Sequence, residues 1–306
     1  MTRERMLVYA RALRVNQWIK NLVVFTAIVF SGKLFDPVLF LNTLYAFVVF
    51  CLLSSTSYLL NDIIDYHYDR KHPIKRNRPI ASGLISIPHA TFLVFIMTLF
   101  TLIISLMFSV SFFFLALIFI LLHFFYSLYL KKHAVIDIFT ISFSFMLRAF
   151  AGEVVTGFHI PSWLVLTIFF ISLFMATIKR HAELVNQGLI TRESLLRYKG
   201  HFLDFLTVTF ATATIIAYST YTYVEQPPPT STAFSQTLHL FIPDFEAKKW
   251  TMITIPFVVY GIARYAQLLY EKDQGERPEK IITKDLPLLT TIFLWAAITI
   301  GLIYLL

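Results

Sequence analysis

Long apolar runs constrain the fold of this chain more than any other feature of its sequence. They recur from one end of the chain to the other, and each is close to the ~20 residues that a helix needs to cross a bilayer. We therefore predict an all-α, polytopic membrane protein of nine transmembrane helices, at roughly 18–35, 38–60, 86–108, 110–130, 135–155, 162–180, 202–224, 250–270 and 285–306. Because no tandem repeat or Gly/Ser-rich linker interrupts these runs, residues 1–306 are predicted to form a single domain.

The composition agrees with membrane insertion. The chain is 57% apolar and 17% aromatic, with a mean hydropathy of +0.70, whereas a soluble domain is typically about 45–50% apolar. In a soluble protein a net charge of +8 would suggest a nucleic-acid partner. Here the cations cluster beside apolar runs, which is typical of membrane orientation and of attraction to anionic lipid. We expect membrane lipid as a partner and no nucleic acid.

The distribution of positive charge predicts the orientation of the chain. Most of the 26 Lys and Arg residues fall before the first predicted span and in every second loop after it. Cytoplasmic loops carry such an excess of cations. The sequence therefore predicts a multi-pass protein of the cell membrane with a cytoplasmic N-terminus and, after nine spans, a C-terminus outside. Long polar connections at 61–85, 181–201 and 271–284 would then face the cytoplasm.

Three carboxylates stand where the second predicted span meets water. Around a helix axis, Asp65 lies about 60° and Asp69 about 20° from Asp62, so a continuous helix places all three on one face. Three like charges on one face repel each other unless a cation lies among them. Mg²⁺ prefers such hard oxygen ligands and usually bridges a few carboxylates to substrate phosphates. The alternative is a solvated loop whose charges only set topology, although topology requires the cations and not the aligned acids.

Five cations follow the carboxylates: Arg70, Lys71, Lys75, Arg76 and Arg78. Pro73 and Pro79 break the helix, so we expect Lys75, Arg76 and Arg78 to fold back over the acids. His67 and His72 lie in the same stretch, and we expect them to be solvated loop residues.

A second candidate cluster is Gln17-Trp18-Ile19-Lys20-Asn21, at the entrance of the first predicted span. Trp18 is typical of an interface anchor, and Lys20 with Asn21 could contact phosphate. For Lys20, a lysine that simply extends its amine to the interface is an equally good interpretation.

A third cluster, Lys179-Arg180-His181-Ala182-Glu183, ends the sixth predicted span. Lys179 and Glu183 are four residues apart and share a helix face, so one interpretation is an exposed ion pair. The other is a second phosphate site, in which Arg180 binds with its planar fork. Glu183 would then either orient the arginine or bind a sugar hydroxyl.

Arg148 lies inside the fifth predicted span, roughly 16 Å further into the bilayer than Asp137 at ~1.5 Å per residue. A charge at that depth is costly and usually faces a cavity with a function. The structural alternative is an ion pair, with Glu153 for example. Tyr126 and Lys131 flank the inner end of the fourth predicted span and could line the mouth of the same cavity.

The stripe Asn61-Asp62-x-x-Asp65-x-x-x-Asp69, placed after a second apolar span, resembles the UbiA-type prenyltransferase superfamily. The resemblance implies an intramembrane bundle with a central cavity that faces the cytoplasm and uses Mg²⁺ to bind a prenyl-carrying diphosphate. Further segments are similar to the decaprenyl-phosphate phosphoribosyltransferase branch: Gln17-Trp18-x-Lys20-Asn21, His72-Pro73-x-Lys75-Arg76-x-Arg78-Pro79-Ile80-Ala81-x-Gly83, Arg148-Ala149-x-Ala151-Gly152, Lys179-Arg180-x-Ala182-Glu183-Leu184 and Ala263-Arg264-Tyr265-Ala266.

The resemblance implies transfer of phosphoribose from 5-phosphoribosyl-1-diphosphate to a polyprenyl phosphate, with release of diphosphate. Asp62, Asp65 and Asp69 would hold Mg²⁺ and act in catalysis. The residues that would bind substrate are Lys20, Asn21, Asn61, Lys75, Arg76, Arg78, Tyr126, Lys131, Arg148, Lys179, Arg180 and Glu183. Typical superfamily members carry a second Asp-rich motif where this chain has cations at 179–180, which favours a lipid monophosphate or sugar phosphate there.

Two other functions stay open at this point. One is the transfer of an isoprenoid from its diphosphate to an aromatic or other acceptor. The other is a transporter of an anionic lipid or metabolite, which predicts inverted repeats and broken helices near the midplane, neither of which the sequence indicates. A homo-oligomer is compatible with the sequence, and prenyl chain length is not encoded in any recognisable pattern.

Overall fold

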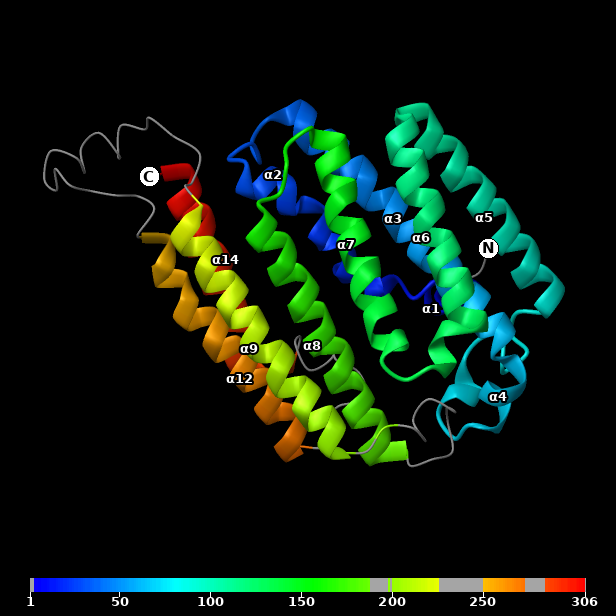
Figure 1. Ribbon diagram of the computed structural model, residues 1–306. Helices are drawn as coiled ribbons and strands as arrows, with labels where there is room; N and C mark the ends of the chain where they lie inside the picture. The colour runs from blue at the N-terminus through cyan, green and yellow to red at the C-terminus, as the bar shows by residue number, and fades with distance from the viewer. Residues whose placement is uncertain (1–2, 188–197, 199, 226–249, 273–283, 306) are drawn as a thin grey trace, which may run out of the picture. The chain divides into compact units, whose positions relative to one another are not determined.

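The computed structural model describes residues 3–187, 198, 200–225, 250–272 and 284–305, and within these ranges it is helical and has no strand. The elements are α1 (Arg3–Ala12), η1 (Val15–Phe25), α2 (Thr26–Phe30), α3 (Pro37–Ile64), α4 (Tyr66–Lys71), η2 (Lys75–Asn77), α5 (Ile87–Phe108), α6 (Val110–Leu128), η3 (Leu130–Lys132), α7 (Ile136–Thr156), α8 (Ser162–Gln187), α9 (Gly200–Val224), η6 (Thr251–Thr254), α12 (Ile255–Lys272) and α14 (Leu286–Leu305). The prediction of an all-α protein is confirmed (Figure 1).

Seven of the described helices are long and apolar enough to cross a membrane: α3, α5, α6, α7, α8, α9 and α14. The prediction of nine spans is not confirmed. The stretch predicted as the first span divides into the 3₁₀ helix η1 and the short helix α2. The stretch predicted at 250–270 forms η6 and then α12, whose 18 residues include Arg264, Gln267, Glu271 and Lys272. Polar side chains in both segments reduce the apolar length.

The described residues form two compact units, the first from residues 3–25 and 41–157 and the second from residues 26–40 and the described part of 158–305. In the first unit, α5 and α6 form a hairpin (Figure 1). Ser109 ends α5 and caps α6, since its Oγ accepts a hydrogen bond from the backbone N–H of Phe112 at 3.1 Å. The core lies between η1, α3, α6 and α7, where Phe50, Phe112 and Phe119 are fully buried.

One close backbone approach fixes η1 in the first unit. A Cβ at Gly152 would lie 1.9 Å from the backbone oxygen of Val24, so α7 and η1 can be this close only because Gly152 has no side chain. Gly157 then ends α7 in the left-handed conformation, at φ 74°.

In the second unit, α8 packs along α9, and α12 packs against both α9 and α14 (Figure 1). Tyr218 on α9 joins these elements: its hydroxyl lies 2.7 Å from Thr254 Oγ1 and accepts a hydrogen bond from Trp295 Nε1 at 2.8 Å. The hydroxyl of Tyr304 on α14 accepts a hydrogen bond from the backbone N–H of Leu34 at 2.8 Å. Neighbouring elements thus satisfy the hydroxyl groups of Tyr218 and Tyr304.

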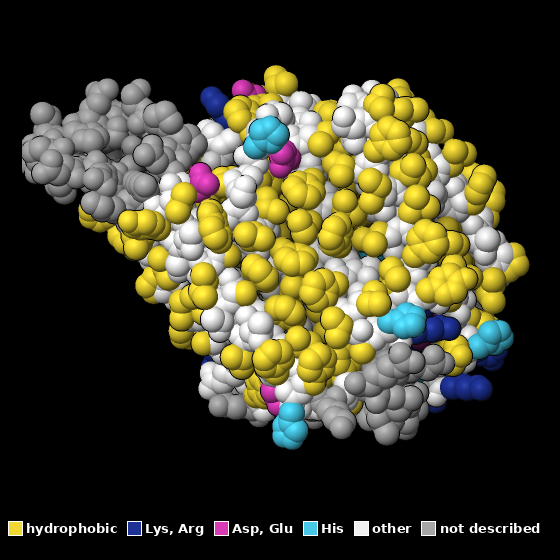
Figure 2. Space-filling view, viewed as in Figure 1, with side chains coloured by type: hydrophobic (Ala, Val, Ile, Leu, Met, Phe, Trp, Pro, Cys, Tyr) yellow, Lys and Arg dark blue, Asp and Glu magenta, His cyan; other side chains and the backbone are white. Residues whose placement is uncertain are grey.

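The outer surfaces of the long helices are apolar. On α5, for example, Phe95 is 63% exposed and Met107 is 80% exposed. Hydrophobic side chains accordingly cover most of the face seen in Figure 2. Apolar surface this extensive is stable in lipid and not in water, so the protein is a multi-pass membrane protein.

Candidate functional site

The acidic stripe begins in the last turn of α3 and ends in α4. The predicted continuous helix is wrong, because α3 ends at Ile64 and Asp65 precedes α4 with φ −85° and ψ 2°. Backbone hydrogen bonds still bridge this break: Asp65 N–H donates to Asn61 O at 2.9 Å, and Asp69 N–H donates to Asp65 O at 2.8 Å. The break is therefore local, and the three carboxylates stay on successive turns of the chain.

Arg78 folds back over the acids, as predicted from the two prolines. Its Nη1 donates to Asp62 Oδ1 at 3.0 Å and to Asp69 Oδ2 at 2.6 Å, and both acids are buried. Burial raises the pKa of Asp69; Arg78 opposes this, while the charges of Asp62 and Asp65 add to it. The two predicted neighbours of Arg78 lie in η2, where Lys75 is half-buried and the Arg76 side chain is exposed.

His72 is not the solvated loop residue expected from the sequence. It is 7% exposed, and its Nδ1 accepts the backbone N–H groups of Ile74 and Lys75 at 3.1 and 3.2 Å. The imidazole is buried because it satisfies the turn that brings Arg78 back. His67, by contrast, is exposed, as expected.

The third acid is held from a different element. Lys131 in η3 donates to Asp65 Oδ1 at 2.5 Å and to Asn61 Oδ1 at 3.2 Å, and Asn61 Nδ2 donates to Asp65 Oδ2 at 3.0 Å. Between η3 and α7, Val135 has φ 70°, a strained conformation for a β-branched residue. Lys131, predicted to line the mouth of a cavity, thus binds Asp65 and Asn61.

Arg14 is the residue that sequence reasoning missed. Its Nη2 donates to Asp62 Oδ1 at 2.5 Å, and its guanidinium lies 4.7 Å from the centre of the Tyr58 ring. Arg14 itself has φ 50° at the junction of α1 and η1. In the sequence it counted only as one of several N-terminal cations, and its place three residues before Gln17 was the one available signal. We call the six residues Arg14, Asp62, Asp65, Asp69, Arg78 and Lys131 the acid–cation cluster.

The acid–cation cluster contains three acids and three cations. Its carboxylate oxygens are suitable ligands for a divalent ion, but they are not already arranged around one metal position. Among the described residues, no three His, Cys, Asp or Glu side chains gather around one point. The side-chain hydrogen bonds that Asp62 accepts from described residues all fall on Oδ1, and the one that Asp69 accepts falls on Oδ2. Asp62 Oδ2 and Asp69 Oδ1 therefore remain for a metal. Mg²⁺ commonly uses one or two carboxylates and completes its shell with water and substrate phosphate.

Arg148 forms a separate buried network in the first unit. Its Nε donates to Asn21 Oδ1 at 2.6 Å, its Nη1 donates to Ser144 O at 2.7 Å, and its Nη2 donates to Ser54 Oγ at 3.3 Å. The guanidinium also lies over the Phe119 and Phe145 rings, at 4.8 and 5.0 Å. The structure thus brings together two predicted site residues, Asn21 and Arg148, that are distant in sequence.

The alternative that Glu153 neutralises Arg148 is wrong, because every acceptor of Arg148 is neutral. A buried guanidinium with only neutral acceptors keeps its full positive charge in a low-dielectric interior. Two other predicted residues are also in this unit: Lys20 is half-buried in η1, and Tyr126 is half-buried in α6 with its ring 6.5 Å from that of His123.

The cluster at 179–183 lies on α8 in the second unit. Arg180 is 1% exposed and its Nη1 binds Glu183 Oε2, three residues later on the same helix. The sequence predicted Lys179 as a partner of Glu183, four residues apart, and the structure pairs Arg180 with Glu183. Lys179 is half-buried. The pair is buried and not exposed, which supports an orienting role for Glu183 over the interpretation as a surface ion pair.

The chain is similar to known proteins over almost its whole length. The model of the UbiA prenyltransferase family matches residues 21–297. The chain belongs to the UbiA family. This UbiA-family chain is 35% identical over 299 residues to the decaprenyl-phosphate phosphoribosyltransferase of Mycolicibacterium smegmatis, covering 95% of this chain and 90% of the relative. It is 33% identical over 304 residues to the protein of the same name from Corynebacterium glutamicum, covering 96% and 86%.

Its fold is also similar to a solved structure of a UbiA homolog from Archaeoglobus fulgidus bound to GPP and Mg²⁺, with a TM-score of 0.70. The two chains are 16% identical, and the match covers 97% of this chain and 99% of the other. At this identity the likeness concerns the fold. The family model and the two relatives confirm the resemblance inferred from the motifs.

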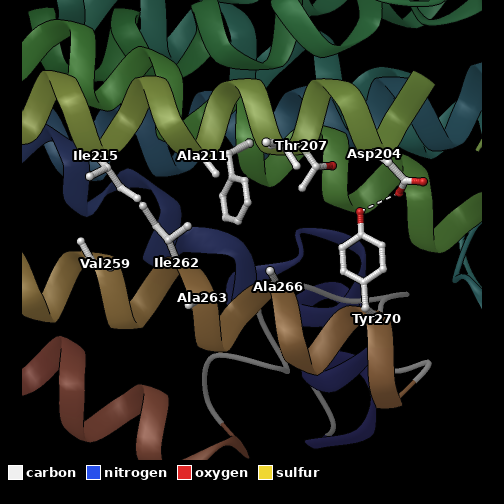
Figure 3. Close-up of a pocket in the computed structure, with 11 residues that line it drawn as sticks. Asp204, Thr207, Ala211, Ile215, Val259, Ile262, Ala263, Ala266 and Tyr270 are labelled. Carbon is white, nitrogen blue, oxygen red and sulfur yellow. Dashed lines mark hydrogen bonds between the residues drawn. The ribbon is translucent and has the colours of Figure 1, made fainter. Parts of the chain in front are cut away.

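The second unit of this UbiA-family member also contains a groove of about 490 Å³ between α9 and α12 (Figure 3). One end is apolar, with Ile215, Val259 and Ile262. At the other end Tyr270 donates a hydrogen bond to Asp204 Oδ1 at 2.8 Å, and His181 Nε2 lies 3.3 Å from the same oxygen. No motif in the sequence indicated this groove, because its mostly apolar lining comes from separate helices, mainly α9 and α12.

Arg264, part of the segment Ala263-Arg264-Tyr265-Ala266, is paired with an acid. Its Nη2 and Nε donate to Asp285 Oδ2 and Oδ1 at 2.8 and 3.2 Å, which links α12 to the start of α14. Asp285 also caps α14, since its Oδ1 accepts the backbone N–H of Leu288 at 2.9 Å.

Proposed function

We propose that this UbiA-family protein transfers 5-phosphoribose from 5-phosphoribosyl-1-diphosphate to a polyprenyl phosphate and releases diphosphate. The observation that carries the proposal is the acid–cation cluster, in which guanidinium forks and carboxylates with free oxygens stand side by side. A diphosphate with its metal needs both kinds of group. Relatives named decaprenyl-phosphate phosphoribosyltransferase, which match 95–96% of the chain, support this donor and this acceptor.

Asp62, Asp65 and Asp69 are the proposed metal ligands and catalytic acids, with Asn61 beside them. When bound, Mg²⁺ would supply positive charge against the diphosphate leaving group. The A. fulgidus homolog, which is bound to GPP and Mg²⁺, supports the use of a divalent ion in this fold. Arg78 and its neighbours Lys75 and Arg76 would neutralise the remaining charge on the diphosphate.

In the proposed reaction the bond between ribose C1 and the diphosphate oxygen breaks, and the electron pair leaves with the diphosphate. The oxygen of the lipid phosphate attacks the oxocarbenium-like C1 and forms the new C–O bond. Because that oxygen is already anionic, no general base is required. The protein would act by holding both substrates in position and by stabilising charge.

The remaining predicted residues are proposed to hold the two monophosphates, that of the ribose and that of the lipid. Arg148 supports this because all its hydrogen-bond acceptors are neutral, so no acid neutralises its charge. Asn21 and Lys20 on η1 would contribute beside it, and Tyr126 and Lys131 would line the approach. In the second unit, Lys179 and Arg180 would bind phosphate, with Glu183 orienting the arginine.

We further propose nine membrane crossings in a single domain, with the stretch η1–α2 and α12 as the two crossings beyond the seven long apolar helices. The excess of cations in alternate loops supports a cytoplasmic N-terminus, an external C-terminus and a central cavity open to the cytoplasm. The prenyl tail of the acceptor would lie between helices in the bilayer. Assembly into a homo-oligomer is compatible with this arrangement.

The second candidate is a prenyltransferase that moves an isoprenoid from its diphosphate to an aromatic or other acceptor. The observation in its favour is the likeness to the A. fulgidus homolog, whose bound GPP is a prenyl diphosphate. The same acids would then serve a prenyl diphosphate and not a ribose diphosphate.

Purified protein in detergent, supplied with Mg²⁺, a polyprenyl phosphate and 5-phosphoribosyl-1-diphosphate labelled in the ribose, tests the proposal. We expect label in the organic phase, and none after addition of EDTA. Folded protein that labels no lipid across several prenyl chain lengths, but consumes a labelled prenyl diphosphate with an aromatic acid, would establish the second candidate instead.

A further inference from the structure

Arg14 occupies a place in the acid–cation cluster that neither the motifs nor the proposed roles account for. It shares Asp62 Oδ1 with Arg78, at 2.5 and 3.0 Å, so two guanidinium groups meet on one carboxylate oxygen. Arg78 is already a proposed diphosphate contact. Arg14 precedes Asp62 in the chain, whereas Arg78 follows it, and Arg14 contacts the same oxygen from the junction between α1 and η1.

The donors of Arg14 are mostly unused. Within the described residues, Nη2 makes the single side-chain hydrogen bond of Arg14, to Asp62, and the ring of Tyr58 covers one face of the guanidinium. A guanidinium has five N–H donors in a planar fork. Arg14 is also 24% exposed, so its remaining donors can reach a ligand from solution.

The structure fixes the position of Arg14 from several directions. Trp18 Nε1 donates to Ser55 Oγ at 3.0 Å, and Ser55 Oγ donates to the backbone oxygen of Leu13 at 2.8 Å, so α3 holds the residue next to Arg14. The positive φ of Arg14 redirects the chain at this point. A flexible surface arginine would need neither a strained backbone nor a buried serine to position it.

We propose that Arg14 is a diphosphate-binding residue which holds Asp62 Oδ1 while no anion is present and passes to phosphate oxygens when one binds. This inference rests on the proposed function, because it assigns a new residue to the same diphosphate. Two forks, Arg14 and Arg78, then bind one diphosphate from two sides, and a planar fork is suited to bidentate phosphate contact. The anion releases Asp62 Oδ1, which adds a free oxygen to the carboxylate.

Binding of inorganic pyrophosphate to the full-length protein in detergent, measured calorimetrically in EDTA and again in Mg²⁺, tests this role without turnover. We expect Arg14→Gln to weaken pyrophosphate binding by about tenfold or more in both conditions, as for loss of a charge-assisted hydrogen bond. Arg14→Lys, which keeps the charge but not the fork, should lie between Arg14→Gln and the wild type. Arg11→Gln is the matched control, since Arg11 is an exposed cation on the preceding turn and should bind as the wild type does.

A double-mutant cycle with Asp62 distinguishes ligand exchange from general electrostatics. In EDTA, Asp62→Asn should tighten pyrophosphate binding, because Arg14 no longer has a competing carboxylate. Most of that gain should disappear in the double variant Asp62→Asn/Arg14→Gln. It should persist in Asp62→Asn/Arg11→Gln, because the same charge is lost at a position that does not contact Asp62.

Thermal unfolding of each variant completes the test. If Arg14→Gln lowers the unfolding temperature but binds pyrophosphate as the wild type does, Arg14 is a structural residue and the inference is wrong. If the wild type transfers phosphoribose, and pyrophosphate binding is lost in Arg78→Gln but not in Arg14→Gln, the proposed function stands and the role of Arg14 falls. If the wild type binds no pyrophosphate and transfers nothing, both fall together.

Discussion

The acid–cation cluster of the first unit and the ion pairs of the second unit use the same residue types in different ways. In the first unit, Asp62 Oδ1 is shared by Arg14 and Arg78, while one oxygen of Asp62 stays free of described donors. The second unit pairs arginines with carboxylates within one helix and between helices. Arg180 binds Glu183 on its own helix. Arg264 binds both oxygens of Asp285 on the next helix.

The difference indicates which charges can respond to a ligand. A carboxylate oxygen with two competing cations, and cations with spare donors, can exchange partners at little cost when a metal and an anion arrive. A bidentate pair, or a pair that buries a guanidinium, loses its partners only with a large penalty. We therefore expect changes in the first unit to act mainly on binding and turnover. Changes in the ion pairs of the second unit should lower stability first, and at Glu183, which orients the proposed phosphate ligand Arg180, weaker substrate binding should accompany that loss.

The largest effect is expected at Asp62. The change Asp62→Asn removes the charge on which two arginines meet and the proposed metal depends, and we expect turnover to fall by about 10²–10³-fold. The unfolding temperature should change little, because Asn keeps the side-chain shape. Asp36→Asn is the control, since Asp36 is exposed, precedes the same helix α3 and caps it. Equal phosphoribosyl transfer by the two variants would sink the assignment of Asp62.

The next largest effect tests how the cluster is supported. In Gly152→Ala the new Cβ meets the backbone of Val24 at 1.9 Å, so η1 must move away from α7. We expect a loss of about 1–3 kcal/mol of stability and a fall in pyrophosphate affinity, because η1 carries the segment next to Arg14. Gly261→Ala on α12 has open space at its Cβ and should leave both quantities unchanged or slightly improved. Unchanged melting of Gly152→Ala would show that η1 is not held here.

Glu183→Gln sharpens the comparison from the second unit. It leaves the buried Arg180 without its carboxylate, and we expect a loss of about 1–3 kcal/mol, measured as a lower unfolding temperature. The double variant Glu183→Gln/Arg180→Gln should recover part of the loss. Glu4→Gln removes an exposed acid of α1 and serves as the control. A normal unfolding temperature with a sharply raised KM would place Glu183 in the substrate site and break the comparison.

The smallest effect is expected at Asp285. Asp285→Asn keeps the cap on α14 but loses the charge opposite Arg264, and about 0.5–1 kcal/mol of stability should be lost. Asp285→Ala removes the cap as well and should cost about 1 kcal/mol more. Thermal unfolding of both variants in the same detergent gives the difference. If the two variants melt together, the cap contributes nothing.

Much of the first unit's site was predictable because it is local in sequence. The spacing of Asp62, Asp65 and Asp69 after an apolar run indicated an acid cluster, and the two prolines indicated that Arg78 returns to it. The same reasoning placed α3, α5, α6, α7, α8, α9 and α14 close to their observed bounds. Apolar length and proline geometry act over a few residues, so they can be read without the fold.

The errors came from contacts between distant segments. Arg14 and Asp62 are 48 residues apart, and Lys131 and Asp65 are 66 residues apart. No periodicity connects them. The pairing of Arg264 with Asp285 also joins separate helices. The break at Asp65 and the burial of His72 are local, but they depend on turn geometry that apolar length and charge spacing do not describe. The first predicted span was also not found as one long helix, because an apolar run does not indicate that part of it, η1, is a 3₁₀ helix.

The sequence alone determined that this protein is a helical membrane bundle of the UbiA type, with acids and cations at the end of its second apolar helix. Hydrophobic length and short-range spacing suffice for the helices and the acids, and the resemblance of the motifs indicates the family. Only the tertiary structure decided which cation binds which acid, because an ion pair forms only between groups that folding brings within hydrogen-bond distance. That choice separates Asp62, where two arginines meet on one oxygen, from Glu183, which Arg180 binds, and Asp285, which Arg264 binds.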